Sequence, residues 1–178
     1  MAGYQNDQGS VSHAWTQWVL SGPYRAWLSH LCAATNLGPQ TIAVAIGIPT
    51  SVARALSDTN RRRHRIRAID AYALMRVNIE SLRQRSRTQT DASPAQDALD
   101  DLGAWCPGVP ELAKHLGVTI KVAADLMARR IDHCPSVVVW RCVALAQDIM
   151  NHNTKQVLGQ LVAAEDDQVH DWASQRAA

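Results

Sequence analysis

Phenylalanine is absent from this chain of 178 residues, and tyrosine and lysine each occur only three times. Few aromatic residues against many Ala, Leu and Val favour helices over a β-sandwich, whose strands are rich in aromatic side chains. No C-x-x-C spacing links the four cysteines, so neither a disulfide framework nor a structural zinc site is indicated. The sequence has no signal peptide and no apolar run long enough to span a bilayer. It therefore predicts an all-α, cytoplasmic protein.

Catalytic motifs are also missing. The sequence contains no phosphate-binding loop, no nucleophile elbow and no H-E-x-x-H metal motif. Its acidic residues gather at Asp97, Asp100 and Asp101 and at 165–167, in polar segments or at expected helix ends, where solvated carboxylates are the ordinary outcome. We therefore expect that the protein is not an enzyme and that it uses no cofactor and no metal.

Charge is divided unequally along the chain. Residues 1–90 contain 11 Lys+Arg and 4 Asp+Glu, a net of +7, whereas residues 91–178 contain 7 and 12, a net of −5. A basic half suits a polyanion, and an acidic half suits a protein partner or a solvated surface. Five arginines within seven residues supply much of the positive charge, namely Arg61, Arg62, Arg63, Arg65 and Arg67.

The stretch 39–56 reads as two short helices joined by a tight turn at Gly47. Apolar residues at helical spacing lie on both sides of this glycine, which can adopt the left-handed backbone that such a turn needs. The pattern predicts a helix-turn-helix, whose second helix enters the major groove of DNA. It returns 70 residues later without a gap, which indicates an internal repeat. The matching pairs are Ile42/Leu112, Ala43/Ala113, Ile46/Leu116, Gly47/Gly117, Ile48/Val118, Val52/Val122, Ala53/Ala123 and Leu56/Leu126.

The repeat predicts two small helical bundles in tandem, with a polar linker between them and an extra C-terminal helix. We expect Trp15 and Trp18 to share one face of a short N-terminal helix and to pack on the following domain. A single helix over about 67–83 would close the first bundle. The expected parts are an N-terminal tail and short helix (1–22), a first helix-turn-helix domain (23–83), a linker with almost no apolar content (84–97), a second such domain (98–152), and an amphipathic helix and tail (153–178).

Residues 27–77 resemble small helix-turn-helix DNA-binding proteins that are common in actinobacteria and their phages, with lambda-repressor-like or homeodomain-like helical domains. The resemblance rests on a W-L-x-x-L stripe that begins at Trp27, on the two motif helices and their basic connection, and on an I-R-A-x-x-A-x-x-L helix that begins at Ile66. It extends more weakly over 98–150. Many such proteins carry a β-branched residue six positions after the glycine, whereas Val52 and Val122 are five after it.

These patterns predict a sequence-specific transcriptional regulator, or a phage- or plasmid-type repressor, that reads a bipartite site on double-stranded DNA. In the first unit Thr50, Ser51 and Arg54 would face base edges, and the five arginines of 61–67 would hold the DNA backbone. Gln40 and Thr41 would lie near phosphates. In the second unit the expected contact residues are Thr119, Ile120, Lys121, Ala124, Arg129 and Arg130.

Two alternatives stay open. The chain could be a non-catalytic architectural or assembly protein that binds DNA non-specifically through the arginine run and a protein partner through its acidic half. The second domain and the C-terminal helix could instead form a homodimer.

Overall fold

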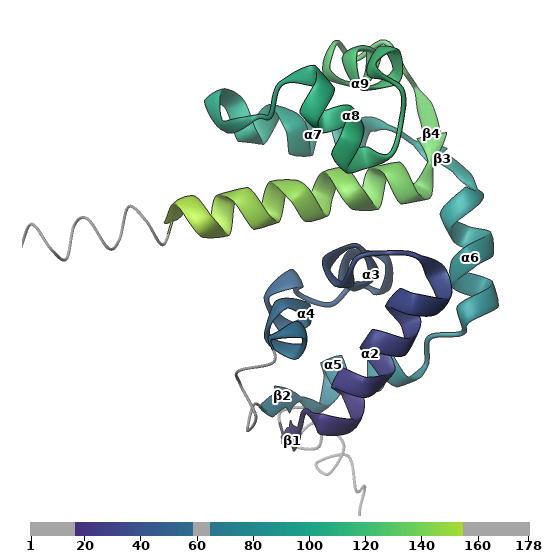
Figure 1. The fold of residues 1–178 in the computed structure, drawn as a ribbon, viewed down its shortest axis with the longest axis vertical. Coiled ribbons are helices and arrows are strands. Elements are labelled where there is room, and N and C mark those ends of the chain that lie inside the picture. Colours follow the sequence, from purple (N-terminus) through teal and green to yellow (C-terminus); the bar gives the residue numbers. More distant parts are fainter. Residues whose placement is uncertain (1–16, 59–64, 155–178) are drawn as a thin grey trace, which may run out of the picture.

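The structure, a computed structural model, describes residues 17–58 and 65–154 (Figure 1). Within these residues the chain is mostly helical, which confirms the predicted all-α class at its coarse level. Four strands of three residues each form two antiparallel ribbons in the described part. None of the described helices is both long enough and apolar enough to cross a bilayer.

The first unit consists of a ribbon and five helices. α2 packs against α3, α4, α5 and α6, so it forms the centre of the unit. Its buried side chains come from every helix and from β2, and they make one continuous apolar core. In chain order the elements are β1 (Trp18–Leu20), α2 (Gly22–Thr35), α3 (Pro39–Ile46), α4 (Thr50–Ser57), β2 (Arg65–Arg67), α5 (Ala68–Met75) and α6 (Ile79–Arg87).

The second unit repeats this order of elements up to the strand that follows its second short helix. It has its own apolar core, which includes one face of a long helix, 136–154, the last element in the described part. That helix spans about 28 Å at the usual rise per residue. The preceding elements are β3 (Gln89–Asp91), α7 (Ser93–Leu102), the 3-10 turn η1 (Gly103–Trp105), α8 (Val109–Leu116), α9 (Ile120–Met127) and β4 (His133–Pro135).

The two helix pairs, α3/α4 and α8/α9, share one turn geometry. Gly47 ends α3 with φ 73° and ψ 27°, and Gly117 ends α8 with φ 67° and ψ 37°. After each glycine, the next amide reaches back to the helix by the same bond: Ile48 N donates to Ala43 O over 3.0 Å, and Val118 N donates to Ala113 O over 3.1 Å. Fully buried residues occupy matched positions 70 apart, including Ile42/Leu112, Ala53/Ala123 and Leu56/Leu126.

Each ribbon joins the residues before a unit's first helix to those after its second short helix. β1 pairs with β2, and β3 pairs with β4, both antiparallel. In β1/β2 the central residues Val19 and Ile66 face each other and turn inward, while the flanking residues of both strands are exposed. The ribbon therefore fastens the start of the unit to the segment that follows α4.

Helix 136–154 crosses between the two units, with α3 and α4 on one side and α7 and α8 on the other (Figure 1). Val138, Cys142 and Ala146 are buried in the second core. Trp140, on the other side of the helix, packs against the first core, and Val137 contacts both cores. The helix is therefore shared by both units.

Two expectations for local structure are wrong. Residues 18–20 form a strand rather than part of a helix, and Trp18 is 61% exposed instead of packing on the domain. The helix expected over 67–83 is two helices, since the chain breaks at 76–78, where Asn78 caps α6 by accepting a bond from the Ser81 amide. Residues 84–97, expected to be a linker, contain the end of α6, β3 and the start of α7.

The N-terminal tail, Trp15, the arginines at 61–63 and the amphipathic segment beyond 154 lie outside the described residues.

Candidate nucleic-acid interface

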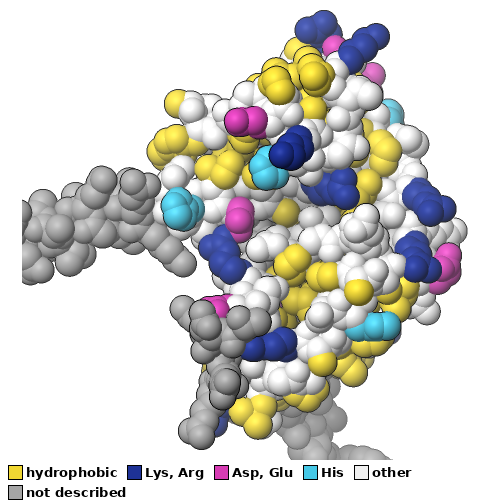
Figure 2. Space-filling model, in the orientation of Figure 1, with side chains coloured by type: hydrophobic (Ala, Val, Ile, Leu, Met, Phe, Trp, Pro, Cys, Tyr) yellow, Lys and Arg dark blue, Asp and Glu magenta, His cyan; other side chains and the backbone are white. Residues whose placement is uncertain are grey.

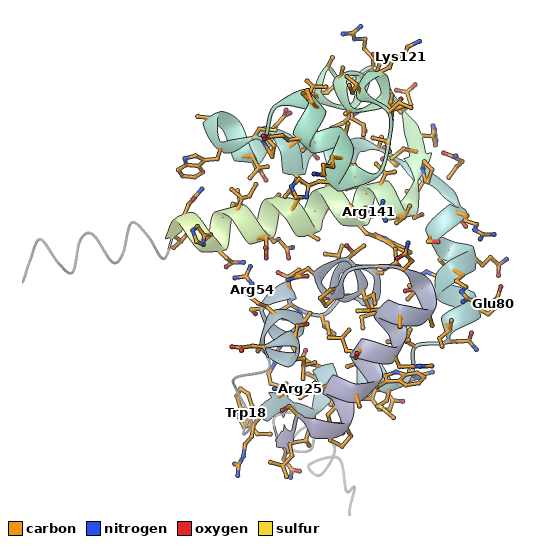
Figure 3. All side chains as sticks on the ribbon, in the orientation of Figure 1. Trp18, Arg25, Arg54, Glu80, Lys121 and Arg141 are labelled. Atoms are coloured by element: carbon orange, nitrogen blue, oxygen red, sulfur yellow. The ribbon has the colours of Figure 1, made fainter. Side chains whose placement is uncertain are left out.

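The start of α4 is in contact with helix 136–154. Thr50 is 3% exposed, and its hydroxyl donates to the Gln147 side-chain oxygen over 2.9 Å. The Arg54 guanidinium forms an ion pair with the Asp148 carboxylate, and Figure 3 shows Arg54 directed from α4 toward the long helix. Ser51, the third residue expected to face bases, is exposed. Two of the three expected reading residues of the first unit are therefore occupied by another part of the chain.

The start of α3 borders a hollow of about 450 Å³ between the units. Gln40 is half-buried and Thr41 is 7% exposed. Across the hollow lie Lys114 and His115 of α8 and Arg141 of helix 136–154. Arg141 Nη1 donates to the Leu116 carbonyl over 2.5 Å, so this guanidinium caps the end of α8. The two residues expected near phosphates thus face the second unit in this arrangement.

The β1/β2 ribbon presents cations and apolar side chains on one exposed face. Trp18 is opposite Arg67, and Leu20 is opposite Arg65, so each cross-strand pair combines an apolar residue with a cation. A groove of about 350 Å³ separates this ribbon from the exposed side of α4. Arg67 Nε also donates to the buried Asp70 carboxylate over 2.9 Å, and this bond raises the pKa of Arg67. Arg65 and Arg67, both expected to hold a DNA backbone, are therefore at the surface beside α4.

The start of α9 is open. Thr119 caps the helix, since its hydroxyl accepts a bond from the Val122 amide over 3.3 Å. Ile120 is 60% exposed, and Lys121 is exposed and points away from the molecule at the end opposite Trp18 (Figure 3). Ala124, one turn later, is half-buried. Ile120 and Lys121 are thus accessible to a partner, whereas the hydroxyl of Thr119 is committed to the helix.

The two arginines after α9 are paired with acidic residues of the second unit. Arg129 has a left-handed backbone, φ 53°, and its guanidinium contacts Asp97 over 2.6 Å and Asp100 over 2.5 Å. The hydrogen bond to Asp100, and to a smaller extent the one to Asp97, raises the pKa of Arg129. Arg130 lies 3.6 Å from Asp125. The acidic cluster on α7 therefore neutralises Arg129, and neither arginine is an unpaired cation beside α9.

Comparisons with protein-family models, with curated proteins and with solved structures find no match to this chain.

Charges of both signs are interspersed over the face drawn in Figure 2, and they do not gather into one basic patch. Within residues 17–58 and 65–154, no group of three His, Cys, Asp or Glu side chains is placed to hold a metal ion. Among the expected contact residues that the described part exposes are Arg65 and Arg67 on the ribbon face beside α4, and Ile120 and Lys121 at the start of α9.

Three residues that lie around α4 were not among the expected contact residues, namely Trp18, Gln147 and Asp148. Trp18 belongs to a three-residue strand, which is too short to show a periodic pattern. Gln147 and Asp148 stand in a helix whose apolar residues were recognised, but their contact with α4 spans more than 90 positions. The available signal was weak: two polar residues that follow the apolar run of 142–146.

Proposed function

We propose that the protein binds double-stranded DNA through two helix-turn-helix units, as a sequence-specific transcriptional regulator or a phage- or plasmid-type repressor. The observation that carries this proposal is the repeated helix pair, in which a left-handed glycine sets the same turn twice and the second helix of one pair has an exposed start. Such a protein would work in the cytoplasm, at the nucleoid.

Each exposed surface has a role in this proposal. α9 is the recognition helix of the second unit, where Lys121 donates to guanine acceptors and Ile120 contacts thymine methyl groups in the major groove. Arg65 and Arg67 bind phosphates beside the first unit, and such contacts fix position without reading sequence. The two surfaces lie at opposite ends of the molecule (Figure 3), so the DNA would be contacted at two separated places. The site is read at both places only when α4 also reaches base edges.

The test is selection of bound fragments from a random pool of duplex DNA, followed by measurements of affinity at several salt concentrations. A specific reader enriches a motif and binds it at least about 1,000-fold more tightly than random DNA. Ile120→Ala should relax the preference at one or two base pairs, at a cost of about 1–3 kcal/mol for the selected site. Arg65→Ala should weaken all DNA about equally and reduce the salt slope by about 1.

The result that would overturn specific recognition is an affinity ratio near one with no enriched motif. The second candidate, an architectural protein that binds DNA non-specifically, would then be the better description. It is favoured by the ribbon, whose cations and Trp18 form a surface suited to a backbone of any sequence. If Ile120→Ala and Arg65→Ala both leave binding to DNA unchanged, the helix pairs serve only to build the fold.

A further inference from the structure

The burial of Thr50 is a consequence of helix 136–154. Thr50 and Ile120 occupy the same position, 70 residues apart, at the first turn of α4 and of α9. Thr50 is 3% exposed and Ile120 is 60% exposed. Since the backbone of the two helix pairs is alike, the difference comes from what covers them. Thr50 is covered by the helix that supplies Gln147, and no described element takes the corresponding place over Ile120.

Two separate contacts hold helix 136–154 on the first unit. Near its start, Val137 and Trp140 pack on the first core, and the Arg85 guanidinium stacks 5.7 Å from the Trp140 ring while it donates to the Ala45 carbonyl over 3.0 Å. Two helical turns later, Gln147 and Asp148 bind Thr50 and Arg54. Seven residues make almost two full turns, so both contacts fall on one side of the helix.

The covered position of α4 is incompatible with docking in a DNA groove. The major groove is about 12 Å wide and admits one α-helix. A helix with its side chains is about 10–12 Å across, so α4 and an adjacent helix do not enter together. Arg54 also has to exchange the Asp148 carboxylate for a base or a phosphate.

We propose that helix 136–154 is an autoinhibitory element of the first unit, and that Gln147 and Asp148 hold α4 closed until the end of this helix moves away. This inference rests on the proposed DNA-binding function. Both members of the Arg54–Asp148 pair are partly exposed, at 35% and 44% of their side chains, so the bond is weak enough to be released. If most molecules are closed, the apparent affinity of the first unit for DNA is reduced in proportion to the small fraction that is open.

The experiment compares Asp148→Asn with Glu80→Gln in the full chain. Each variant removes one negative charge from an exposed carboxylate, but Glu80 lies on α6, away from α4 (Figure 3). The first readout is chemical: Thr50→Cys is introduced in each background, and the labelling rate of this thiol is followed by peptide mass spectrometry. The second readout is the affinity for DNA selected with wild-type protein.

Asp148→Asn should raise the labelling rate at position 50, and the affinity for DNA, by about two- to fivefold, whereas Glu80→Gln should leave both unchanged. Equal labelling rates in the two variants would show that Asp148 does not hold helix 136–154 over position 50. If Asp148→Asn is labelled faster but binds DNA no more tightly than Glu80→Gln, the helix does not inhibit DNA binding. The proposed DNA-binding function would still hold in that case. If no variant binds any DNA although position 50 becomes labelled, the proposed function fails and the inhibition fails with it.

Discussion

The two units share one backbone arrangement but differ in the charge of their ribbons and in the exposure of their second short helices. Each has a glycine turn of the same conformation and matched buried residues. The first unit carries a ribbon with Arg65 and Arg67, but the start of α4 is covered. The second has an open α9, but the corresponding ribbon carries Asp91 opposite His133 and Gln89 opposite Pro135. The unit with the more basic surroundings is therefore the one with the less accessible second helix.

This difference teaches that the charge of a segment does not determine whether the second helix of its pair is accessible. Net charge depends on local composition, and it favoured the first unit as the DNA reader. Accessibility depends on which distant element packs on the helix, and here helix 136–154 favours the second. If the units also differ in packing, matched substitutions in their cores and turns should have unequal effects, and their ribbons should respond differently to pH.

The largest expected difference concerns the last residue of the first helix in each pair. Leu116 is fully buried in the second core, whereas Ile46 is half-buried beside a hollow lined by Tyr72, Val77 and Arg85. Leu116→Ala should lower the free energy of unfolding by about 2–5 kcal/mol, because a closed core cannot fill the cavity. Ile46→Ala should cost about 1 kcal/mol, because water already reaches its outer side. Urea unfolding of the full chain, followed by circular dichroism, measures both.

An equal loss of unfolding free energy in Leu116→Ala and Ile46→Ala would contradict this prediction. It would mean that the two cores are equally closed at these positions and that the hollow beside Ile46 is filled in solution.

A smaller difference is expected at the two turn glycines. Alanine at either position has to adopt a left-handed backbone, which costs about 1–2 kcal/mol. A Cβ at Gly47 meets no atom within 4 Å, whereas at Gly117 it would lie 2.5 Å from Arg141 Nη1. The guanidinium would have to leave the Leu116 carbonyl, which adds about 0.5–1.5 kcal/mol. Thermal unfolding should therefore rank Gly117→Ala below Gly47→Ala in stability.

A double-mutant cycle separates the steric contribution from the backbone contribution. In an Arg141→Ala background the added Cβ has no guanidinium to displace, so Gly117→Ala should cost no more than Gly47→Ala. An unchanged extra cost in that background would show that the displaced arginine is not its cause.

The helix pairs could be predicted closely because their signals are local. A glycine turn and apolar residues at helical spacing lie within 18 positions, and α3 and α4 occur where the spacing indicated. The ribbons could not be predicted, since each strand has three residues and its partner is more than 40 positions away. The break at Asn78 had a local signal, an Asn that caps the next helix, but the apolar stripe continued through it.

The candidate interface divides in the same way. The exposure of Lys121 follows from its charge and its place on an amphipathic helix. The exposure of Ile120, an apolar residue, depends instead on tertiary structure, since no described element packs over it. The cover over Thr50 and the pairing of Arg129 with Asp97 and Asp100 are tertiary contacts, and no spacing in the sequence encodes them.

The smallest expected difference concerns the ribbons and pH. Asp91 accepts bonds from the Ser93 amide over 2.9 Å and the Ser93 hydroxyl over 2.8 Å, and these bonds, with a smaller contribution from His133, lower the pKa of Asp91. A carboxyl with a lowered pKa in the folded state stabilises the protein above its unfolded pKa, and this stabilisation is lost as the pH falls through the folded value. The advantage of wild type over Asp91→Asn in melting temperature should therefore be largest near neutral pH and shrink below about pH 4.

Leu20 occupies the corresponding place in the first ribbon and has no titratable group, so Leu20→Asn is the matched control. The difference in melting temperature between wild type and Leu20→Asn should stay constant from pH 7 to pH 3, whereas the Asp91→Asn difference changes over that range. If both differences are constant, the ionised carboxylate of Asp91 adds nothing that its amide cannot supply. The two ribbons would then differ in what they offer a partner and not in how they hold their units together.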